Sequence, residues 1–563
     1  MLRIVLSGLL LSVLIGCASA TRAAVPTQFI AKMYSEALGR APDPQGWLAA
    51  VKYFQRSGCS RKTLETRRSA VLSSPEFLGL HYDPAALVLI LYRAILNREP
   101  DAAGYRSWYS ALEHAQSLSA IGAAFFHSKE FARLVPAICS GESYSFGTFG
   151  TGLAIPIPMS HSGGVSGVDE AELQTLLAKA RAGGTVYLRQ QSVIYLNRSL
   201  IIPAGVTLAT EGLPDPRHHA LMARLIRATP FPAPMIEINA DASLSRSGSL
   251  RSLWIDGERS AASAYVPGAI DVEIDGGNQA TVESSFLSGS LGWSTLHSYG
   301  ALDHRPCASN IITGNVVTAY ASVHANGEWT DGLSIGCEHS LVEHNQVIDP
   351  TDVGIVVFTA YPARQQSVVS GNVVVSAGNS AFGALGFDPL QNRSAGQPDF
   401  TGSEISDNTL WSGPNTHFII GLAVGSRPWY PQGSIGHGAQ ATGNTTAGIR
   451  TNFAAGIVVS GMQDATVQGN DLLSSPIPSS WTHCPIGNVL ASVSAGLASG
   501  SIQPYSDVAV NGCMSDYSYS GITPRRHPHP CQRHGDWAIS CRRSGDLMAE
   551  SYAERRTSEP EGT

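Results

Sequence analysis

Asparagines recur through the second half of the chain at intervals that restrict what it can fold into. They stand at Asn315, Asn345, Asn372, Asn408, Asn444 and Asn470, each three residues after a small or apolar side chain. The intervals of 30, 27, 36, 36 and 26 residues are typical of a solenoid, in which each repeat packs only on its neighbours. Because an amide side chain both donates and accepts, a column of asparagines can hydrogen-bond from one repeat to the next.

Glycine-led apolar runs follow most of these asparagines and complete the repeat. They begin at Gly332, Gly354, Gly383, Gly421 and Gly456. Each repeat predicts a short strand, a turn at the asparagine, a second strand, a corner and a third strand opened by glycine. Residues 250–258 and 280–289 keep the strand pattern upstream, with Ser285 at the asparagine position. We therefore expect an all-β solenoid of about ten coils over residues 169–480.

The opening of this region and its repeat resemble a known group of proteins. Residues 169–184 form an amphipathic pattern with Leu173 and Leu177 on one side, and short β-rich runs follow. This order resembles the cap and first turns of a right-handed parallel β-helix. The repeat resembles the pectate-lyase-like group, which contains polysaccharide lyases, polygalacturonases, alginate C5-epimerases and phage tailspikes. The resemblance implies a flat face, many coils long, that suits a repetitive ligand.

Two cysteines occupy equivalent positions in successive coils. Cys307 stands eight residues before Asn315, and Cys337 stands eight residues before Asn345. Stacked strands lie about 4.7–4.9 Å apart, and a disulfide accepts Cα separations of about 4.4–6.8 Å. A disulfide is therefore feasible, and a stacked pair of reduced, buried thiols is the alternative.

Residues 26–135 carry a different repeat, with helical character. The segment from Tyr34 to Trp47 recurs from Tyr92 to Tyr105, and each copy closes with Ser-x-Glu-Phe, ending at Phe77 and Phe131. Each copy predicts a helix, a Pro-Asp-x-x-Gly turn and further helices. The matching positions resemble the tandem domain of unknown function family 4214, which is found in bacterial exported and surface proteins and has no settled chemistry. A linker rich in Gly, Ser and Pro is expected over residues 136–168.

The N-terminal residues indicate export. A basic residue and an apolar run precede Leu14-Ile15-Gly16-Cys17, an ending that resembles the bacterial lipobox, with Cys17 lipidated and residues 1–17 removed. Ala18 after the cysteine favours the outer membrane, and an ordinary signal peptide is the alternative.

Residues 481–563 are expected to close the fold and then to be disordered, and their His and Cys spacing matches no zinc site. The net charge of −7 argues against a nucleic-acid partner.

Long loops after the third strand provide the expected binding wall. They cover residues 359–366, 388–402 and 426–437, and their candidate ligand-binding residues are Tyr361, Asp388, Arg393, Arg427, Trp429 and Tyr430. Aromatic faces stack on sugar rings, and arginines hold uronate carboxylates in bidentate fashion. Candidate catalytic residues are Asp331, Asp349 and Asp352 at the preceding corners and Arg364 in the first loop.

These residue types allow more than one reaction. A lyase or epimerase needs a base and a group that neutralises the uronate carboxylate, whereas a hydrolase needs two carboxyl groups. Asp331 and Asp352 precede glycines at equivalent positions, so we expect them to lie close together and to serve hydrolysis or to hold calcium. The epimerase motif is present in part: residues 385–390 keep Gly-Phe-Asp-Pro but carry leucine in place of its tyrosine and histidine.

The sequence thus predicts an exported, lipid-anchored bacterial protein with a small all-α tandem repeat followed by a right-handed parallel β-helix. The leading hypothesis is a lyase or C5-epimerase acting on an acidic, uronate-containing glycan. The alternatives are a non-catalytic module that binds glycan or organises the surface, and a β-helix glycoside hydrolase that uses paired carboxylates. No resident metal or other cofactor is predicted, with calcium left open, and the oligomeric state is not indicated.

Overall fold

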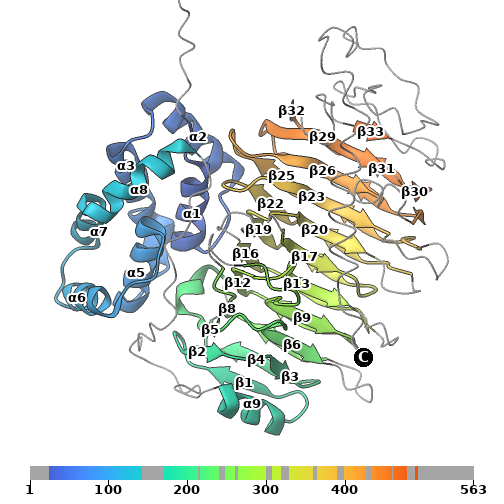
Figure 1. Cartoon of the computed structure of the whole chain (residues 1–563), viewed down its shortest axis with the longest axis horizontal. Coiled ribbons are helices and arrows are strands. Elements are labelled where there is room, and N and C mark those ends of the chain that lie inside the picture. The colour runs from blue at the N-terminus through green and yellow to red at the C-terminus, as the bar shows by residue number, and fades with distance from the viewer. Residues whose placement is uncertain are drawn as a thin grey trace, which may run out of the picture.

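The chain folds into a helical unit packed against a right-handed parallel β-helix, which confirms the predicted fold class (Figure 1). The computed structural model describes residues 24–141, 170–213, 216–239, 247–259, 264–299, 307–318, 329–358, 364–389, 398–425, 434–459, 461–477 and 489–491. Cys17 and most of the tail after residue 477 lie outside these residues. Among the described helices, none is both long and apolar enough to cross a bilayer.

Three parallel sheets, named here sheets A, B and C, run the length of the β-helix. Sheet A contains β1 (Thr185–Leu188), β4 (Thr207–Thr210), β7 (Ser249–Arg251), β11 (Thr281–Glu283), β15 (Ile311–Thr313), β18 (Leu341–Glu343), β21 (Val368–Ser370), β24 (Glu404–Ser406), β28 (Gln440–Thr442) and β31 (Thr466–Gln468). Sheet B contains β2 (Val193–Leu196), β5 (Ala223–Arg227), β8 (Leu253–Asp256), β12 (Phe286–Ser288), β16 (Val316–Thr318), β19 (Gln346–Ile348), β22 (Val373–Ser376) and β25 (Thr409–Ser412).

Sheet C carries the longer strands and is the face toward the viewer in Figure 1. It contains β3 (Leu200–Ile202), β6 (Ile236–Asn239), β9 (Val272–Asp275), β13 (Ser294–Tyr299), β17 (Asp331–Ile335), β20 (Val353–Phe358), β23 (Ala381–Asp388), β26 (Phe418–Val424), β29 (Thr451–Val459), β32 (Ser474–Pro476) and β33 (Val489–Ala491). Two short ladders lie at a corner, β10 (Gly277–Asn278) with β14 (Cys307–Ala308), and β27 (Gly436–His437) with β30 (Met462–Gln463). The helix α9 (Glu170–Lys179) precedes β1, and the short helix η2 (Pro216–Leu221) precedes β5.

The six asparagines form one continuous buried ladder. The side-chain amide of Asn315 donates to Asn345 at 2.9 Å, and Asn345 donates in turn to Asn372 at 3.0 Å. The same bond repeats through Asn408, Asn444 and Asn470 at 2.8–2.9 Å. Each amide also donates to a backbone carbonyl of the preceding coil, as Asn345 does to Ile312 at 2.8 Å. The ladder therefore satisfies buried turn groups that the strands leave unpaired.

The helical unit, residues 24–141, contains two copies of the predicted repeat. The first copy holds α1 (Thr27–Leu38), α2 (Pro44–Ser57), α3 (Arg61–Leu72) and α4 (Pro75–Gly79). The second holds α5 (Pro84–Leu91), η1 (Tyr92–Leu96), α6 (Ala102–Glu113), α7 (Leu118–His127) and α8 (Lys129–Ser140). The helix α8 thus extends past the boundary predicted at residue 135.

The repeated motif has the same internal contacts in both copies. In the first, Arg40 makes a bidentate pair with Glu76 at 2.6 and 2.8 Å, and Asp43 caps α2 by accepting the Gly46 N–H at 2.7 Å. A Cβ on Gly46 would lie 2.3 Å from the Tyr34 hydroxyl, so only glycine fits there. In the second copy, Arg98 pairs with Glu130, Asp101 caps α6 and Tyr92 lies against Gly104. The shared residues therefore hold each copy together.

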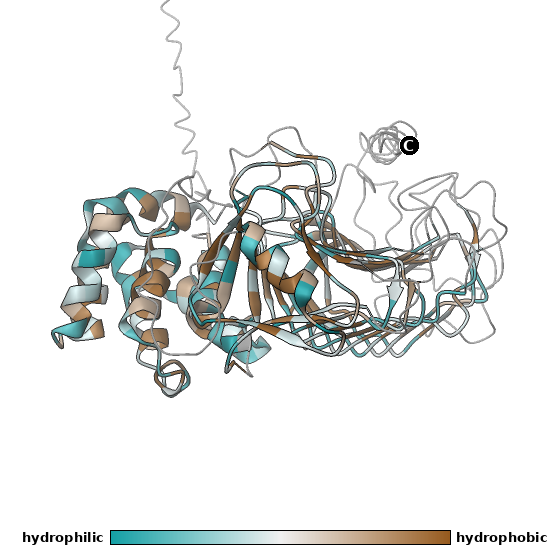
Figure 2. Cartoon of the chain, turned by 90° about the horizontal axis from the view of Figure 1, so that it is seen from below, coloured by the Kyte–Doolittle hydropathy of each residue, from teal (hydrophilic) through white to brown (hydrophobic). Residues whose placement is uncertain are grey.

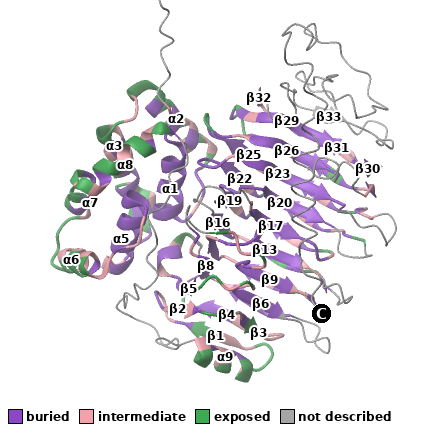
Figure 3. Cartoon of the chain, in the orientation of Figure 1, coloured by how far each residue is buried: buried purple, intermediate pink, exposed green. Residues whose placement is uncertain are grey.

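The helical unit covers the outer face of sheet B. Figure 2, seen from the α9 end, shows the helices against one side of the coil cross-section, and Figure 3 shows that exposed residues gather on the helices away from the sheets. One buried apolar cluster contains residues of both parts, including Trp47, Trp254, Phe286 and Trp411. A second cluster fills the interior of the coils. Two disulfides are present in the described residues, Cys59–Cys139 within the helical unit and Cys307–Cys337 between adjacent coils.

Candidate functional site

The predicted catalytic carboxylates lie in different environments in the structure. Asp349 lies in the turn after β19 and is 0% exposed. Its Oδ1 accepts the backbone N–H groups of Ala377, Gly378 and Asn379 at 2.5, 2.8 and 3.3 Å. Burial raises the pKa of Asp349 to about 6, against the lowering effect of these hydrogen bonds. Helix α1 closes the turn, because Thr27 Oγ1 donates to the Ala377 carbonyl. Asp349 is therefore a buried turn cap that a ligand does not reach in this conformation.

Asp331 and Asp352 lie in adjacent coils at the start of β17 and β20. Asp331 Oδ1 accepts the Val353 N–H at 3.0 Å, which places the Asp331 carboxyl group beside the residue that follows Asp352. Both side chains are nearly covered, with Asp331 2% and Asp352 5% exposed. The two corners therefore lie close together, as expected. The Asp331 carboxyl group uses this closeness to accept a backbone N–H group of the neighbouring corner.

Asp331 also belongs to a chain of hydrogen-bonded hydroxyl groups. Ser334 Oγ donates to Asp331 Oδ2 at 2.9 Å and lies 2.9 Å from Ser294 Oγ on the neighbouring coil. Ser294 Oγ in turn donates to the Leu296 carbonyl at 2.8 Å. Ser334 therefore connects the Asp331 carboxyl group to the neighbouring strand β13.

Of the remaining predicted residues, Arg364 and Asp388 are described by the structure, and the others are not. Arg364 is half exposed in a corner ladder, where its Nε lies 3.0 Å from Asp399 Oδ2, and His437 Nε2 lies 3.6 Å from Asp399 Oδ1. Asp388 ends β23, is 1% exposed and is the register partner of Phe358. The other predicted ligand-binding residues lie outside the described residues: Tyr361, Arg393, Arg427, Trp429 and Tyr430.

A cluster that the sequence analysis missed lies on the outer face of sheet C, on β9 and β13. Leu296 packs into the coil interior, so the alternation of a strand turns His297 outward. His297 Nδ1 lies 2.9 Å from Glu273 Oε1, its register partner on β9. The imidazole is flanked by aromatic rings, with Trp293 edge-on at 4.3 Å and Tyr299 stacked at 5.2 Å between centroids.

This cluster has the parts of a proton-transfer site. Glu273 fixes which ring nitrogen of His297 faces the carboxylate, so Nε2 lies on the other side of the ring. Ser334 is the register partner of His297 on the next coil, which brings the Asp331 chain beside it. Trp293, Tyr299 and Glu273 are partly exposed, whereas His297 is 5% exposed. A partly dry, aromatic surrounding strengthens electrostatic interactions with a bound molecule.

Farther along sheet C the outer face becomes apolar. Val356, Gly386, Ala423 and Val458 follow Ser334 in register on successive strands. The two valines and Ala423 belong to a separate buried apolar cluster. The polar and ionisable part of the outer face therefore lies at its lower-numbered strands. Within the described residues, no group of three or more His, Cys, Asp and Glu side chains is arranged to hold a metal ion.

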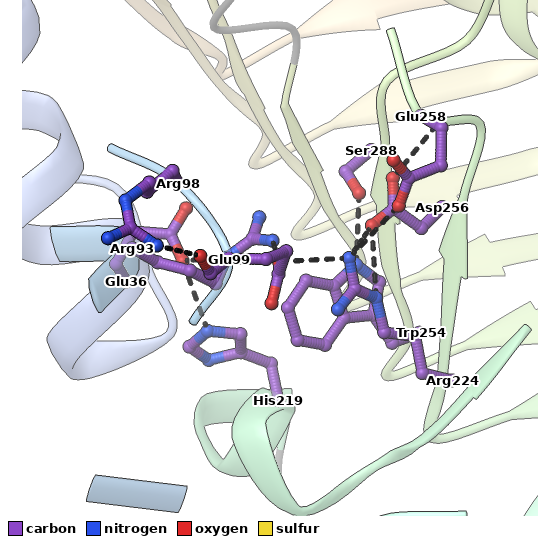
Figure 4. Close-up of polar contacts among 10 residues, drawn as sticks. All are labelled: Glu36, Arg93, Arg98, Glu99, His219, Arg224, Trp254, Asp256, Glu258 and Ser288. Atoms are coloured by element: carbon purple, nitrogen blue, oxygen red, sulfur yellow. Dashed lines mark hydrogen bonds and ion pairs between the residues drawn. The ribbon is translucent and has the colours of Figure 1, made fainter. Parts of the chain in front are cut away.

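The densest buried ion network lies elsewhere, between the helical unit and sheet B (Figure 4). Arg93 pairs with Glu36 at 2.8 Å and also with Glu99, which lies 3.1 Å from Arg224. Arg224 also pairs with Asp256. Burial raises the pKa of Glu258, which lies 3.4 Å from Arg224, to about 8. Because opposite charges meet at close range and the arginines are nearly fully buried, we interpret this network as structural.

Comparison with known proteins finds matches to both parts of the chain. A family model described as "Domain of unknown function (DUF4214)" matches residues 68–135. No curated protein sequence matches the chain. Three solved structures show what the β-helix is similar to. The mannuronan C-5 epimerase AlgE6 A-module of Azotobacter vinelandii is 16% identical, with a TM-score of 0.39 and coverage of 59% of this chain and 78% of that one.

The other two structures are comparably distant. An alginate lyase from Paenibacillus sp. str. FPU-7 is 13% identical, with a TM-score of 0.36 over 59% of this chain and 98% of that chain. The tailspike protein of E. coli bacteriophage HK620 is 12% identical, with a TM-score of 0.32 over 56% and 64%. At these identities the similarity concerns the fold alone.

Proposed function

We propose that this protein acts on an acidic, uronate-containing glycan by lyase or C5-epimerase chemistry, and that the reaction takes place on the outer face of sheet C at β9 and β13. The observation that carries the proposal is the 2.9 Å contact between His297 Nδ1 and Glu273. A histidine held in this way by a carboxylate, between aromatic rings on an outward-facing strand, has the arrangement of a general base.

The proposed chemistry follows from His297 and the carboxylate that holds it. His297 Nε2 removes the proton from the sugar carbon next to the uronate carboxylate, and Glu273 stabilises the imidazolium that forms. In a lyase, the electron pair then forms a double bond and expels the glycosidic oxygen, which takes the proton from His297. In an epimerase, a water molecule gives a proton to the opposite face of the same carbon, and the hydroxide that remains takes the proton from His297. Trp293 and Tyr299 would stack on neighbouring sugar rings.

A second candidate, glycoside hydrolysis, is favoured by the carboxylates on the same face. Glu237 and Glu273 are register partners on adjacent strands, and Asp275 follows Glu273 two residues later on the same side. These spacings correspond to about 4.8 Å between strands and about 7 Å along one strand. They lie near the carboxyl separations of retaining and inverting glycosidases, about 5–5.5 Å and 6.5–9.5 Å.

Export is part of the same proposal. The two disulfides of the described residues are typical of an oxidising compartment. The lipobox-like sequence ending at Cys17 supports a lipid anchor at the outer membrane, where the β-helix would meet glycan. Growth of cells with a labelled lipid precursor, in parallel for wild type and the Cys17→Ala variant, tests the anchor separately from the activity.

Product analysis tests the reaction itself. The purified protein is incubated with a panel of uronate polysaccharides and neutral glycans, with and without Ca²⁺. Unsaturated ends appear by ultraviolet absorbance in the case of a lyase, inverted C5 centres appear by NMR in the case of an epimerase, and new reducing ends alone indicate a hydrolase. His297→Gln should lower the rate by about 10²–10⁴-fold, whereas His344→Asn, on an exposed turn of sheet A, should leave it unchanged. Full activity of His297→Gln would refute the proposed base.

A further inference from the structure

The helical unit contacts the β-helix through residues that differ between its two copies. Arg93 and Glu99 of the second copy contact the β-helix, and the equivalent positions of the first copy hold Ser35 and Ala41. The shared tyrosines, arginines and capping aspartates instead make contacts within their own copy. The residues shared by the two copies therefore stabilise each copy, and the positions that differ between the copies determine what the unit binds.

The surface that receives the unit is the outer face of sheet B. Its outward side chains form two columns, one with Trp254, Phe286 and Val316, and the other with Ile348, Val375 and Trp411. All of them belong to the apolar cluster shared with the helices. Without a cover, these columns would form an exposed apolar strip, which soluble proteins rarely leave open.

Aromatic and ionic contacts fix the position of the unit on this strip. Trp254 lies between two guanidinium groups, with Arg93 at 4.4 Å and Arg224 at 4.2 Å from the ring centroid, and its indole N–H donates to Ser288 at 2.9 Å (Figure 4). Glu99 pairs with both arginines, one from each side of the interface. A large aromatic ring and desolvated charge pairs at the centre of a contact are typical of binding hot spots.

Direct polar and close contacts extend the interface over the full length of sheet B. At one end, Gln191 before β2 donates to Asp83 at 2.9 Å. At the other, Asn415 after β25 donates to the Val25 carbonyl at 3.1 Å. Between them, a Cβ on Gly378 would lie 2.5 Å from Gln28, so the turn after β22 approaches α1 as closely as glycine allows.

From this geometry we infer that the helical repeat is a docking module whose ligand is the outer face of a parallel β-sheet. The module recognises an aromatic-apolar strip with arginine and carboxylate groups at one end. In this protein it closes sheet B to any other partner, so a glycan must use another face. The inference does not depend on the proposed enzymatic activity.

A cleavage experiment on the full chain tests whether docking needs the covalent connection. A protease site is inserted between Gly163 and Gly164, and the protein is cut after folding. The account predicts that the two pieces stay together in gel filtration and on dilution. Glu99→Lys places a third cation between Arg93 and Arg224, and it should weaken the association by about a hundredfold or more.

Two further variants make the outcome decisive. Glu113→Lys makes the same charge change on α6, which Figure 1 shows on the side of the unit away from the sheets, and it should have no effect. Gly378→Arg, on the β-helix side, should also separate the pieces by displacing α1. Circular dichroism of the uncut variants checks that both parts remain folded. Separation of the cut wild-type pieces while both stay folded, or equal association of Glu99→Lys and wild type, would overturn the inference.

Discussion

Removal of one asparagine from the ladder should cost a large part of the stability of the β-helix. In the structure the Asn372 side chain accepts the backbone N–H of Asn345 at 2.9 Å and its amide at 3.0 Å. It donates to Asn408 Oδ1 and to the Val342 carbonyl, both at 2.9 Å. Asn372→Ala removes these four hydrogen bonds and a fifth, from the amide to the Ser370 carbonyl at 3.1 Å, at a site that is 0% exposed.

The magnitude follows from which groups are left without partners. Two buried donors of Asn345 lose their acceptor, at about 1–3 kcal/mol each, and two buried acceptors lose a donor at about 0.5–1.5 kcal/mol each. These contributions sum to about 3–9 kcal/mol, so we expect the free energy of unfolding to fall by at least roughly 3 kcal/mol, against a typical total of about 5–15 kcal/mol.

Urea unfolding followed by far-ultraviolet circular dichroism measures this loss. Asn197→Ala is the matched control, because Asn197 is exposed and should change the free energy of unfolding by no more than about 0.5 kcal/mol. Asn372→Asp tests the donor half of the bonds, since a carboxylate still accepts from Asn345 but cannot donate to Asn408. A loss below about 1 kcal/mol for Asn372→Ala would contradict the ladder as a source of stability.

Three further outcomes follow from single contacts. Replacing Cys307 and Cys337 by serine opens a link of sequence separation 30 and should cost about 3–4 kcal/mol in urea unfolding; an unchanged midpoint would contradict this. The pKa of Asp349 is raised to about 6, so the folded state binds this proton more tightly than the unfolded chain, and stability should rise as the pH falls from 7 toward 4. Asp349→Asn should remove roughly 2 kcal/mol of that rise; a parallel pH dependence in both proteins would argue against it. Ser334→Ala removes a hydrogen-bond donor to Asp331, whose carboxyl group is nearly covered, and should lower the free energy of unfolding by about 1–3 kcal/mol; an unchanged urea midpoint would contradict this contact.

The period of the sequence was sufficient to predict the β-helix. An asparagine amide has little reason to recur every 26–36 residues unless it bonds to its neighbour in the next coil, and the ladder from Asn315 to Asn470 does this. The same register placed Cys307 opposite Cys337, with Cα atoms 4.9 Å apart in the structure. The glycine-led run from Gly354 is strand β20 in the structure, and its Ile355 and Val357 lie in the core of the coils.

The site could not be predicted in the same way, for two physical reasons. The coil before Asn315 carries Ser285 at the ladder position, so no asparagine marks β13 as a strand, and His297 is not among the predicted site residues. The strand signal that could have found it is the alternation of Leu296 inward with His297 and Tyr299 outward. Asp349, predicted as a catalytic corner residue, is covered instead by α1, which lies more than three hundred residues earlier, and no local sequence pattern shows such a contact.

The most direct test of the central claim is a crystal structure of the His297→Gln variant with a bound oligouronate. The account predicts that the oligosaccharide lies along the outer face of sheet C, with a sugar ring stacked near Trp293 and Tyr299. The carboxylate-bearing carbon of that sugar should lie within about 3.5 Å of the side chain at position 297. An oligosaccharide bound to sheet A, or to the corner ladder of Arg364, with the β9 and β13 face empty, would contradict it.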